Sequence, residues 1–163
     1  MNACRAHVPI LVTAGRTPIT EGPLPGARNR YIHWAQEAFV QGALVREFVK
    51  WDYELRTETQ LETVVDRALA VAGAEPPGPV YLTLPREVLA ERMEALEYSD
   101  PSRAPRNSAT LPEAAAIAEA ARLLAAATNP IIIAKAPGRD PAAVAPLVRL
   151  AEALGAPCFD HWP

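Results

Sequence analysis

Residues 78–88 of the chain read GPVYLTLPREV. The section from Pro79 to Leu84 is apolar, and it is bounded by a glycine on one side and a proline on the other. Short apolar runs between such turn-forming residues are typical of buried strands. We therefore predict a core strand from Pro79 to Leu84, followed by a charged surface helix from Arg86 to Leu96.

The segment from Val8 to Thr13 is a second apolar run. It shows no alternation of apolar and polar side chains, which is the pattern of a strand with both faces covered by helices. Residues 16–30, in contrast, are too rich in proline, glycine and charge to form a regular element. These features predict an α/β fold with parallel sheets flanked by helices, and a long loop that leaves the first strand.

Two helices are predicted between these strands. Residues 31–51 are dense in aromatic side chains, and we predict a helix from Gln36 to Arg46 and a short strand from Phe48 to Trp51. A stronger signal is the Thr-x-x-Glu form at residues 59–62, whose two side chains can satisfy the first free amides of a helix that ends at Gly73. The predicted buried face of this helix consists of Leu61, Val64, Val65, Ala68, Leu69 and Ala72.

The second half of the chain follows a predicted linker. Residues 99–110 hold prolines, serines and arginines but few apolar groups. A second Thr-x-x-Glu form at residues 110–113 begins an alanine-rich helix that is predicted to end at about Ala127. We accordingly divide the chain into residues 1–98, the linker and residues 111–163.

A βαβ unit is predicted in residues 131–159. It starts with a strand at Ile131–Ala134 and continues with a helix that has Asp140 as its N-cap and proline at its first position. Gly155 ends this helix, and a further strand begins at Ala156. A crossover between parallel strands of this kind is expected to be right-handed.

Composition narrows the class of function. The chain has 163 residues, 50% hydrophobic side chains and a formal net charge of −3. It is therefore expected to be globular, and its mild acidity gives no field that would attract nucleic acid or an anionic membrane surface. We expect no membrane span and no export signal, since no apolar run reaches about 18 residues. Cys4 and Cys158 lack metal-binding or disulfide spacing, which fits a reducing cytoplasm.

Both predicted sheets are short of neighbouring strands. A single βαβ unit leaves two strand edges unpaired, and a doubly covered parallel sheet needs more strands than the first part of the sequence supplies. We expect that further sequence belongs at both ends. We also expect the isolated polypeptide to be poorly soluble, because apolar edges would be exposed.

Several motifs resemble the thiamine diphosphate-dependent enzymes. Residues 8–15 and the Gly-Pro-Val-x-Leu-x-Leu-Pro-x-Glu-Val string at residues 78–88 resemble the second half of the pyrimidine-binding domain of that family. Between them, HWAQE at residues 33–37 is similar to its Gln-Glu element, and residues 48–51 fall at its lysine-bearing strand. Residues 129–157 resemble the N-terminal beginning of the family's central domain. The likeness is greatest to acetolactate synthase and its decarboxylase and acetyltransferase relatives.

The resemblance implies a function for the complete enzyme and a place for this chain within it. Residues 1–98 would be the C-terminal part of the pyrimidine-binding domain, and residues 111–163 the N-terminal part of the Rossmann-like central domain. The family uses thiamine diphosphate and Mg²⁺ to decarboxylate 2-keto acids and, in acetolactate synthase, to form a carbon–carbon bond. Its activating glutamate precedes the first strand, and a Gly-Asp-Gly motif holds the diphosphate. This sequence has no acidic residue before Glu21 and no Gly-Asp-Gly. No catalytic residue is therefore assigned, and we expect a fragment that is not catalytic alone.

Three residues are carried over from the resemblance. Gln36 matches a glutamine that can bind a substrate carboxylate or carbonyl, and Lys50 matches a lysine whose charge would attract a keto acid. Gly138 stands in a strand-to-helix turn of the domain that carries FAD in the acetolactate synthase branch, so FAD is left open as a cofactor. The family also implies a transferase or lyase that forms a homodimer or homotetramer.

For each of these residues, a role without any ligand contact stays open. Gln36 can be a solvated helix start, Lys50 a surface charge, and a single glycine is weak evidence for a dinucleotide site. His33 is predicted to have a packed or hydrogen-bonded structural role. For the whole chain, the alternatives are a relative of benzoylformate or oxalyl-coenzyme A decarboxylase, and a non-catalytic α/β nucleotide-binding module that uses Gly138.

Overall fold

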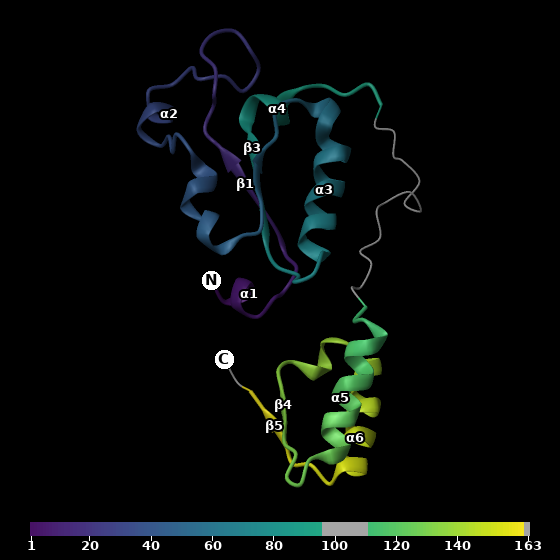
Figure 1. The fold of residues 1–163 in the computed structure, drawn as a ribbon. Coiled ribbons are helices and arrows are strands. Elements are labelled where there is room, and N and C mark those ends of the chain that lie inside the picture. The colour runs from purple at the N-terminus through teal and green to yellow at the C-terminus, as the bar shows by residue number, and fades with distance from the viewer. Residues whose placement is uncertain (96–110, 162–163) are drawn as a thin grey trace. The chain divides into compact units, whose positions relative to one another are not determined.

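A computed structural model describes residues 1–95 and 111–161 of the chain (Figure 1). The chain divides into two compact units, Met1–Ala109 and Thr110–Pro163, and each is described by itself. The predicted linker at residues 99–110 lies outside the described residues. Within the described ranges, no helix has the length and the apolar character that crossing a membrane requires.

A parallel sheet forms the centre of the first unit. Its strand order is β1-β3-β2, and the register places Leu11 opposite Val80 and Asp52 opposite Tyr81. The central strand is buried at all but one position, as its apolar sequence requires. The predicted α/β fold with a parallel sheet is confirmed. The strands are β1 (Leu11–Arg16), β2 (Asp52–Glu54) and β3 (Val80–Pro85).

Helix α3 (Leu61–Gly73) lies against one face of this sheet (Figure 1). The predicted buried face is confirmed at Val64, Ala68 and Ala72 but is wrong at Leu69, which is 53% exposed. Full burial of a side chain such as Leu82 contributes about 1.5–3 kcal/mol. The core between helix and sheet consists of Leu55, Val64, Ala68, Ala72, Val80, Leu82 and Val88.

Residues 17–48, which we call the covering segment, lie on the other side of the sheet (Figure 1). The predicted helix from Gln36 to Arg46 is wrong, because this part of the chain forms only short turns. It has no apolar stripe to bury, and Phe39 and Val40 remain exposed. The elements of the segment are α2 (Ile32–Ala35) and the 3-10 turns η1 (Gln41–Leu44) and η2 (Arg46–Phe48).

Several predicted boundaries are displaced in the structure. The first strand begins at Leu11 instead of Val8. The strand predicted from Phe48 to Trp51 is wrong, because β2 covers Asp52–Glu54 and Phe48 ends the turn η2. Before β2, the Lys50 amide donates to the Pro79 carbonyl at 2.8 Å. The Thr-x-x-Glu cap at residues 59–62 does not form, because the 3-10 turn η3 (Glu58–Gln60) occupies that position and α3 has no side-chain cap. After β3, helix α4 (Arg86–Ala90) is shorter than predicted. A four-residue helix, α1 (Asn2–Arg5), precedes β1.

The second unit contains the predicted βαβ unit. Its strands are parallel, and the helix between them begins as predicted, with Oδ1 of Asp140 accepting a 2.9 Å hydrogen bond from the Ala142 amide. Gly155 ends the helix in the left-handed conformation, with φ +58°. The alanine-rich helix has Glu113 as its N-cap without a side-chain hydrogen bond, and Thr110 lies outside the described residues. The elements are α5 (Ala114–Ala126), β4 (Ile132–Ala134), η5 (Pro137–Arg139), α6 (Pro141–Leu154) and β5 (Cys158–Asp160).

The sheet of the second unit leaves apolar side chains uncovered. Ile133 and Phe159 are opposite each other in the β4–β5 register and are 65% and 54% exposed. Among the described residues of this unit, Ala156 is the one buried apolar side chain. Two strands and two helices of this size do not enclose a hydrophobic core.

Candidate functional site at the carboxyl edge of the first sheet

Charged side chains gather where the strands of the first sheet end. β1 ends at Arg16 and β2 at Glu54, and the register places both side chains on the face of the sheet that carries Thr83. Arg16 reaches across β3, and its Nη1 donates a hydrogen bond to the Glu54 carboxylate. Because ligands of open parallel sheets bind beyond the carboxyl ends of the strands, we take this edge as the candidate site.

Glu37 joins the covering segment to this edge. Its Oε1 accepts a 3.3 Å hydrogen bond from Nη2 of Arg16, and its Oε2 accepts a hydrogen bond from Nη2 of Arg28. Both contacts are ion pairs. The side chains of Arg16 and Glu37 are each 12% exposed and that of Arg28 is 5% exposed. Two guanidinium groups therefore share one carboxylate in a mostly buried position, where such charge-assisted bonds are strong.

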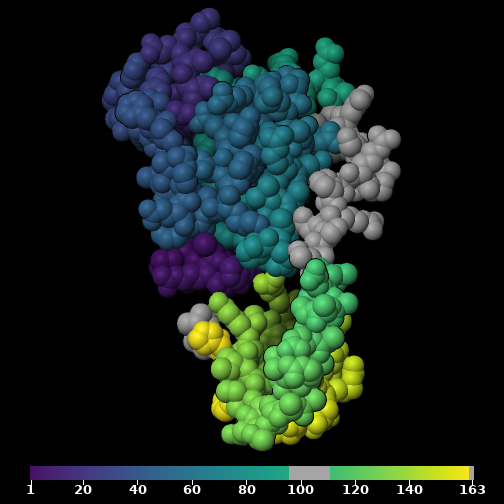
Figure 2. All heavy atoms as spheres, in the orientation of Figure 1, coloured from purple at the N-terminus to yellow at the C-terminus, as the bar shows by residue number. Residues whose placement is uncertain are grey.

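Arg28 also packs on an aromatic ring. Its Cζ lies 4.6 Å from the centre of the Trp34 ring, which is the geometry of a cation–π contact. Trp34 belongs to α2, so one arginine holds both the helix and the glutamate that follows it. In the space-filling view, the covering segment, coloured purple to blue, forms one flank of the first unit (Figure 2).

A second polar contact joins the covering segment to α4, directly after β3. Oε1 of Glu87 accepts hydrogen bonds from the Thr20 amide at 2.7 Å and from the Thr20 hydroxyl at 2.8 Å. Burial raises the pKa of the Glu87 carboxyl, but the hydrogen bonds from Thr20 lower it by more, so the net pKa lies below the usual glutamate value. Glu87 is therefore ionised at neutral pH.

His33 lies close to the same place. It is buried, and its Nε2 is 3.3 Å from Nη1 of Arg86. His33 is packed as predicted, and its structural role stays a prediction. In the described part of the chain, the buried side-chain nitrogen and oxygen atoms that have no hydrogen-bond partner all belong to residues near this edge. These atoms are Arg16 Nε, Thr17 Oγ1, Arg28 Nη1, His33 Nδ1 and Glu87 Oε2.

Gln36 lies between the two residues that Arg28 holds. It is the C-cap residue of α2, and its side chain is exposed. A different glutamine contacts the sheet directly: Nε2 of Gln41 donates to the Gly15 carbonyl at 3.0 Å and to the Tyr81 hydroxyl at 2.9 Å. Gln36 therefore lies next to Glu37, which joins the carboxyl edge, and its amide makes no hydrogen bond with the described residues, whereas Gln41 makes structural contacts.

Lys50 lies at the opposite end of the sheet. Its backbone pairs with Pro79, just before β3 begins, and its Nζ donates to the Val71 and Ala74 carbonyls at 2.6 and 2.7 Å. These carbonyls belong to the last turn of α3 and the residue after it, where a cation is favourable. The structure does not bring Lys50 together with Gln36, and a role of Lys50 in substrate binding stays a prediction.

Gly138 lies in η5, between β4 and α6. A Cβ at this position would meet no heavy atom within 4 Å, and the left-handed residue of the turn is Ala136, not Gly138. The first amides of α6 are also partly used, because Asp140 already accepts from Ala142. Asp140 therefore occupies part of the N-terminus that an anion would need, and the predicted cofactor contact at Gly138 stays a prediction.

Sequence reasoning assigned neither arginine of the site a role, since loop solvation was the default expectation for Arg16. Both lie in a stretch that composition marks as a loop, whereas the structure buries Arg28 and leaves the Arg16 side chain 12% exposed. The available signal was that Arg16 directly follows a core strand, since the ends of parallel strands converge on one edge of the sheet. The partners of Arg28 could not be found from spacing alone.

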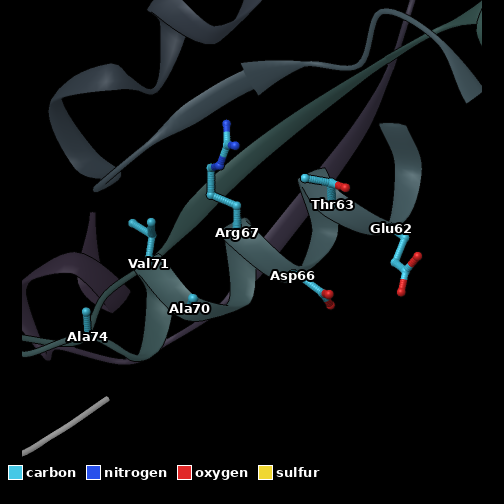
Figure 3. Close-up of a pocket in the computed structure, with 7 residues that line it drawn as sticks. All are labelled: Glu62, Thr63, Asp66, Arg67, Ala70, Val71 and Ala74. Carbon is cyan, nitrogen blue, oxygen red and sulfur yellow. The ribbon is translucent and has the colours of Figure 1, made fainter. Parts of the chain in front are cut away.

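A surface pocket lies along α3, away from the carboxyl edge of the sheet (Figure 3). It has a volume of about 470 Å³, and among the described residues it is lined by one side of this helix and by Ala74. Its charged side chains diverge, because Arg67 points to one side of the helix and Glu62 and Asp66 to the other (Figure 3). The pocket therefore has no convergent polar groups. In the described ranges, no three His, Cys, Asp or Glu side chains are grouped as metal ligands.

Comparison with curated proteins finds several relatives, although no family model matches the chain. Sulfoacetaldehyde acetyltransferase from Rhodobacter capsulatus is 32% identical over 152 residues, which is 93% of this chain and 23% of that protein. Benzoylformate decarboxylase from Pseudomonas aeruginosa is 29% identical over 81% of this chain and 23% of that protein. The acetolactate synthase large subunit from Lactococcus lactis is 32% identical over 58% of this chain and 15% of its own length.

Solved structures agree with these relatives. A Mycobacterium smegmatis protein that has been assigned to the thiamine diphosphate-dependent enzymes matches 97% of this chain with a TM-score of 0.71 and 26% identity. A 4-hydroxybenzoylformate decarboxylase from Rhodococcus jostii matches 98% of it with a TM-score of 0.70 and 26% identity. In both cases the match covers 28% of the other chain.

The homologues and structural neighbours of this chain are thiamine diphosphate-dependent enzymes, and the resemblance expected from the sequence is confirmed. The chain spans about a quarter or less of the length of these three curated relatives. Within the family, the relatives include both acetolactate synthase and benzoylformate decarboxylase, and they do not separate these two branches.

Proposed function

We propose that this chain is one section of a thiamine diphosphate-dependent enzyme that acts on 2-keto acids. In this proposal, residues 1–98 form the C-terminal part of the pyrimidine-binding domain, and residues 111–163 form the start of the central domain. The observation that carries the proposal is the structural match over 98% of the chain to a thiamine diphosphate-dependent 4-hydroxybenzoylformate decarboxylase. The polar carboxyl edge of the first sheet supports it independently, since ligands bind at such edges.

In this proposal, Gln36 contacts the substrate. A 2-keto acid presents a carboxylate and a carbonyl, and the amide of Gln36 can donate to either of them. The exposed side chain at the end of α2 leaves both the donor and the acceptor of this amide available. Lys50 is kept in the proposal as a separate candidate for substrate binding at the opposite end of the sheet, although its ammonium caps α3 here.

The residues of this chain do not fit the diphosphate and its metal. No group of three metal-ligating side chains occurs in the described ranges, and the sequence contains no Gly-Asp-Gly. The carboxylates at the carboxyl edge are already engaged: Glu37 and Glu54 by arginines, and Glu87 by Thr20. We therefore propose that the chain is not catalytic alone and derive no chemical step from it.

The properties of the complete enzyme are part of the same proposal. It would use thiamine diphosphate with Mg²⁺, with FAD left open, and act as a transferase or lyase in the cytoplasm. It would form a homodimer or homotetramer. Acetolactate synthesis is the preferred activity, with benzoylformate or oxalyl-coenzyme A decarboxylation as the alternative branch.

Calorimetric titration of the full chain with pyruvate and with benzoylformate tests the assigned contact. We expect weak saturable binding of one of these acids, and about tenfold weaker binding by Gln36→Ala, which corresponds to the loss of one hydrogen bond. Gln60→Ala, an exposed glutamine before α3, is the matched control and is expected to bind like the unmodified chain. The absence of saturable heat with both acids would refute the proposed substrate contact.

A second titration concerns the cofactor. The full chain is dialysed against thiamine diphosphate with and without Mg²⁺, and bound cofactor is measured at equilibrium. We expect no saturable binding in either condition, because the chain lacks the residues that hold the diphosphate. Magnesium-dependent binding by this chain would contradict the proposal that it is not catalytic alone.

A further inference from the structure

Arg28 is a buried charged residue at the carboxyl edge, and its side chain is 5% exposed. We propose that Arg28 is a positioning residue that fixes Gln36 for contact with the substrate. This inference rests on the proposed function, because it takes the role of Gln36 from there. It assigns Arg28 no contact with the substrate itself.

The contacts of Arg28 surround Gln36 in the chain. The guanidinium packs 4.6 Å from the centre of the Trp34 ring, two residues before Gln36. Its Nη2 donates to the carboxylate of Glu37, the residue directly after Gln36. A guanidinium can do both at once because it is planar, so that its face contacts the ring while its edge donates hydrogen bonds.

The backbone around Gln36 forms a turn between Trp34 and Glu37. The Glu37 amide lies 3.5 Å from the Trp34 carbonyl, and the Trp34 amide donates to the Tyr31 carbonyl at 3.1 Å. Fixing the side chains of Trp34 and Glu37 therefore fixes the Cα of Gln36 between them. This matters because the Gln36 side chain is exposed and makes no hydrogen bond with the described residues, so only its backbone can orient it.

Arg28 is itself anchored independently of α2. Its backbone amide donates to the Thr20 carbonyl at 2.8 Å, and the same Thr20 binds Glu87 through its amide and hydroxyl. Its neighbour Ala27 is 1% exposed. The arginine thus connects α2 to a part of the chain that is held at the end of β3.

Amide hydrogen exchange tests the positioning directly. In Arg28→Met, we expect the amides of residues 31–38 to exchange about tenfold faster or more, since one charge-assisted bond and one ring contact are lost. The amides of β3 are expected to be unchanged. Arg46→Met is the matched control, because Arg46 pairs with Asp52 at 2.8 Å on the surface and does not contact α2.

A spectroscopic measurement accompanies the exchange experiment. Arg28→Met is expected to change the fluorescence intensity and the emission maximum of Trp34. To isolate Trp34 from the other tryptophans, the effect of Arg28→Met is measured with Trp34 present and again in a Trp34→Phe background, and the two effects are compared. Arg28→Lys keeps the charge but not the planar fork, and is expected to show most of the same effect. If Arg28→Met does not fold, Arg28→Lys and Glu37→Gln are the variants on which the exchange of residues 31–38 is measured.

Keto-acid affinity separates positioning from a purely structural role. Of pyruvate and benzoylformate, the acid that the unmodified chain binds more tightly is used. Arg28→Met is expected to weaken its binding about as much as Gln36→Ala does, and Arg46→Met is expected to leave its binding unchanged. If exchange of residues 31–38 is unaffected in the Arg28 variants, or if their affinity matches that of Arg46→Met, the inference is overturned. If the unmodified chain binds neither pyruvate nor benzoylformate, the proposed substrate contact fails, while exchange still shows whether Arg28 fixes the backbone at Gln36.

Discussion

Lys50 donates a 2.7 Å hydrogen bond from Nζ to the backbone carbonyl of Ala74, directly after the last residue of α3. The same ammonium group donates to Val71 at 2.6 Å, so it satisfies two carbonyls that the helix itself leaves free. Gly78 makes room for this arrangement, since a Cβ there would lie 3.1 Å from Cδ of Lys50.

Replacing Lys50 is expected to destabilise the first unit. Lys50→Met should lower the free energy of unfolding by about 1 kcal/mol, the typical value for a cation at a helix C-terminus. Urea unfolding followed by circular dichroism measures the change, with Lys135→Met, an exposed lysine of the second unit, as the control. A stability equal to that of the unmodified chain, combined with weakened keto-acid binding, would favour the substrate-binding role over the structural one.

Glu87 is expected to make stability depend on pH. Its pKa in the folded chain is lower than in the unfolded chain, so its contribution is fully present above the ordinary glutamate pKa of about 4.3 and is lost as the pH falls through the folded value. At pH 7, Glu87→Gln should lower the free energy of unfolding by about 1–3 kcal/mol. In strong acid, the unmodified chain and the variant should be equally stable. A difference that does not change between pH 7 and pH 2 would contradict this assignment.

Gly26 is expected to tolerate no side chain. Its φ is +80°, and a Cβ would lie 2.9 Å from the Arg86 carbonyl oxygen. Gly26→Ala combines backbone strain with a clash, and should cost about 1–3 kcal/mol of unfolding free energy. Gly15→Ala is the control, since a Cβ there meets nothing within 4 Å and φ is not positive. Equal thermal stability of the two variants would show that the turn at Gly26 is not tightly packed.

The uncovered sheet face of the second unit is expected to promote self-association. Ile133 and Phe159 are neighbours across β4 and β5, and both are more than half exposed. Exposed apolar patches of this kind promote aggregation. The double variant Ile133→Thr, Phe159→Thr should reduce concentration-dependent light scattering, whereas Leu69→Thr, a replacement on the outer side of α3, should not. Equal scattering by the two variants would place the aggregating surface elsewhere.

The regular elements could largely be predicted from local sequence. The β3 strand and the βαβ unit are apolar runs separated by proline and glycine, and the ends of α6 follow from Asp140 and Gly155. Each of these signals acts within a few residues. Where two local signals competed, as at residues 58–62, the 3-10 turn replaced the expected cap.

The covering segment could not be predicted in the same way. Its path is fixed by contacts between distant residues, such as Arg16 with Glu54, 38 positions apart, and Thr20 with Glu87, 67 positions apart. No local periodicity encodes such pairs, and for this reason a helix from Gln36 to Arg46 was predicted wrongly. Similarly, a resemblance placed Lys50 near a substrate, whereas its surroundings in three dimensions include the end of α3.

The position of β3 has a consequence for synthesis of the chain. Among the described strands, β1 pairs with β3 alone, and β3 is synthesised about 70 residues after Leu11. Until then, the edge of β1 that pairs with β3 presents unpaired amides and carbonyls, and exposed edges of this kind are prone to aggregation. Slow translation between residues 16 and 80 would lengthen this exposure, so the yield of folded protein is expected to depend on how quickly that interval is read.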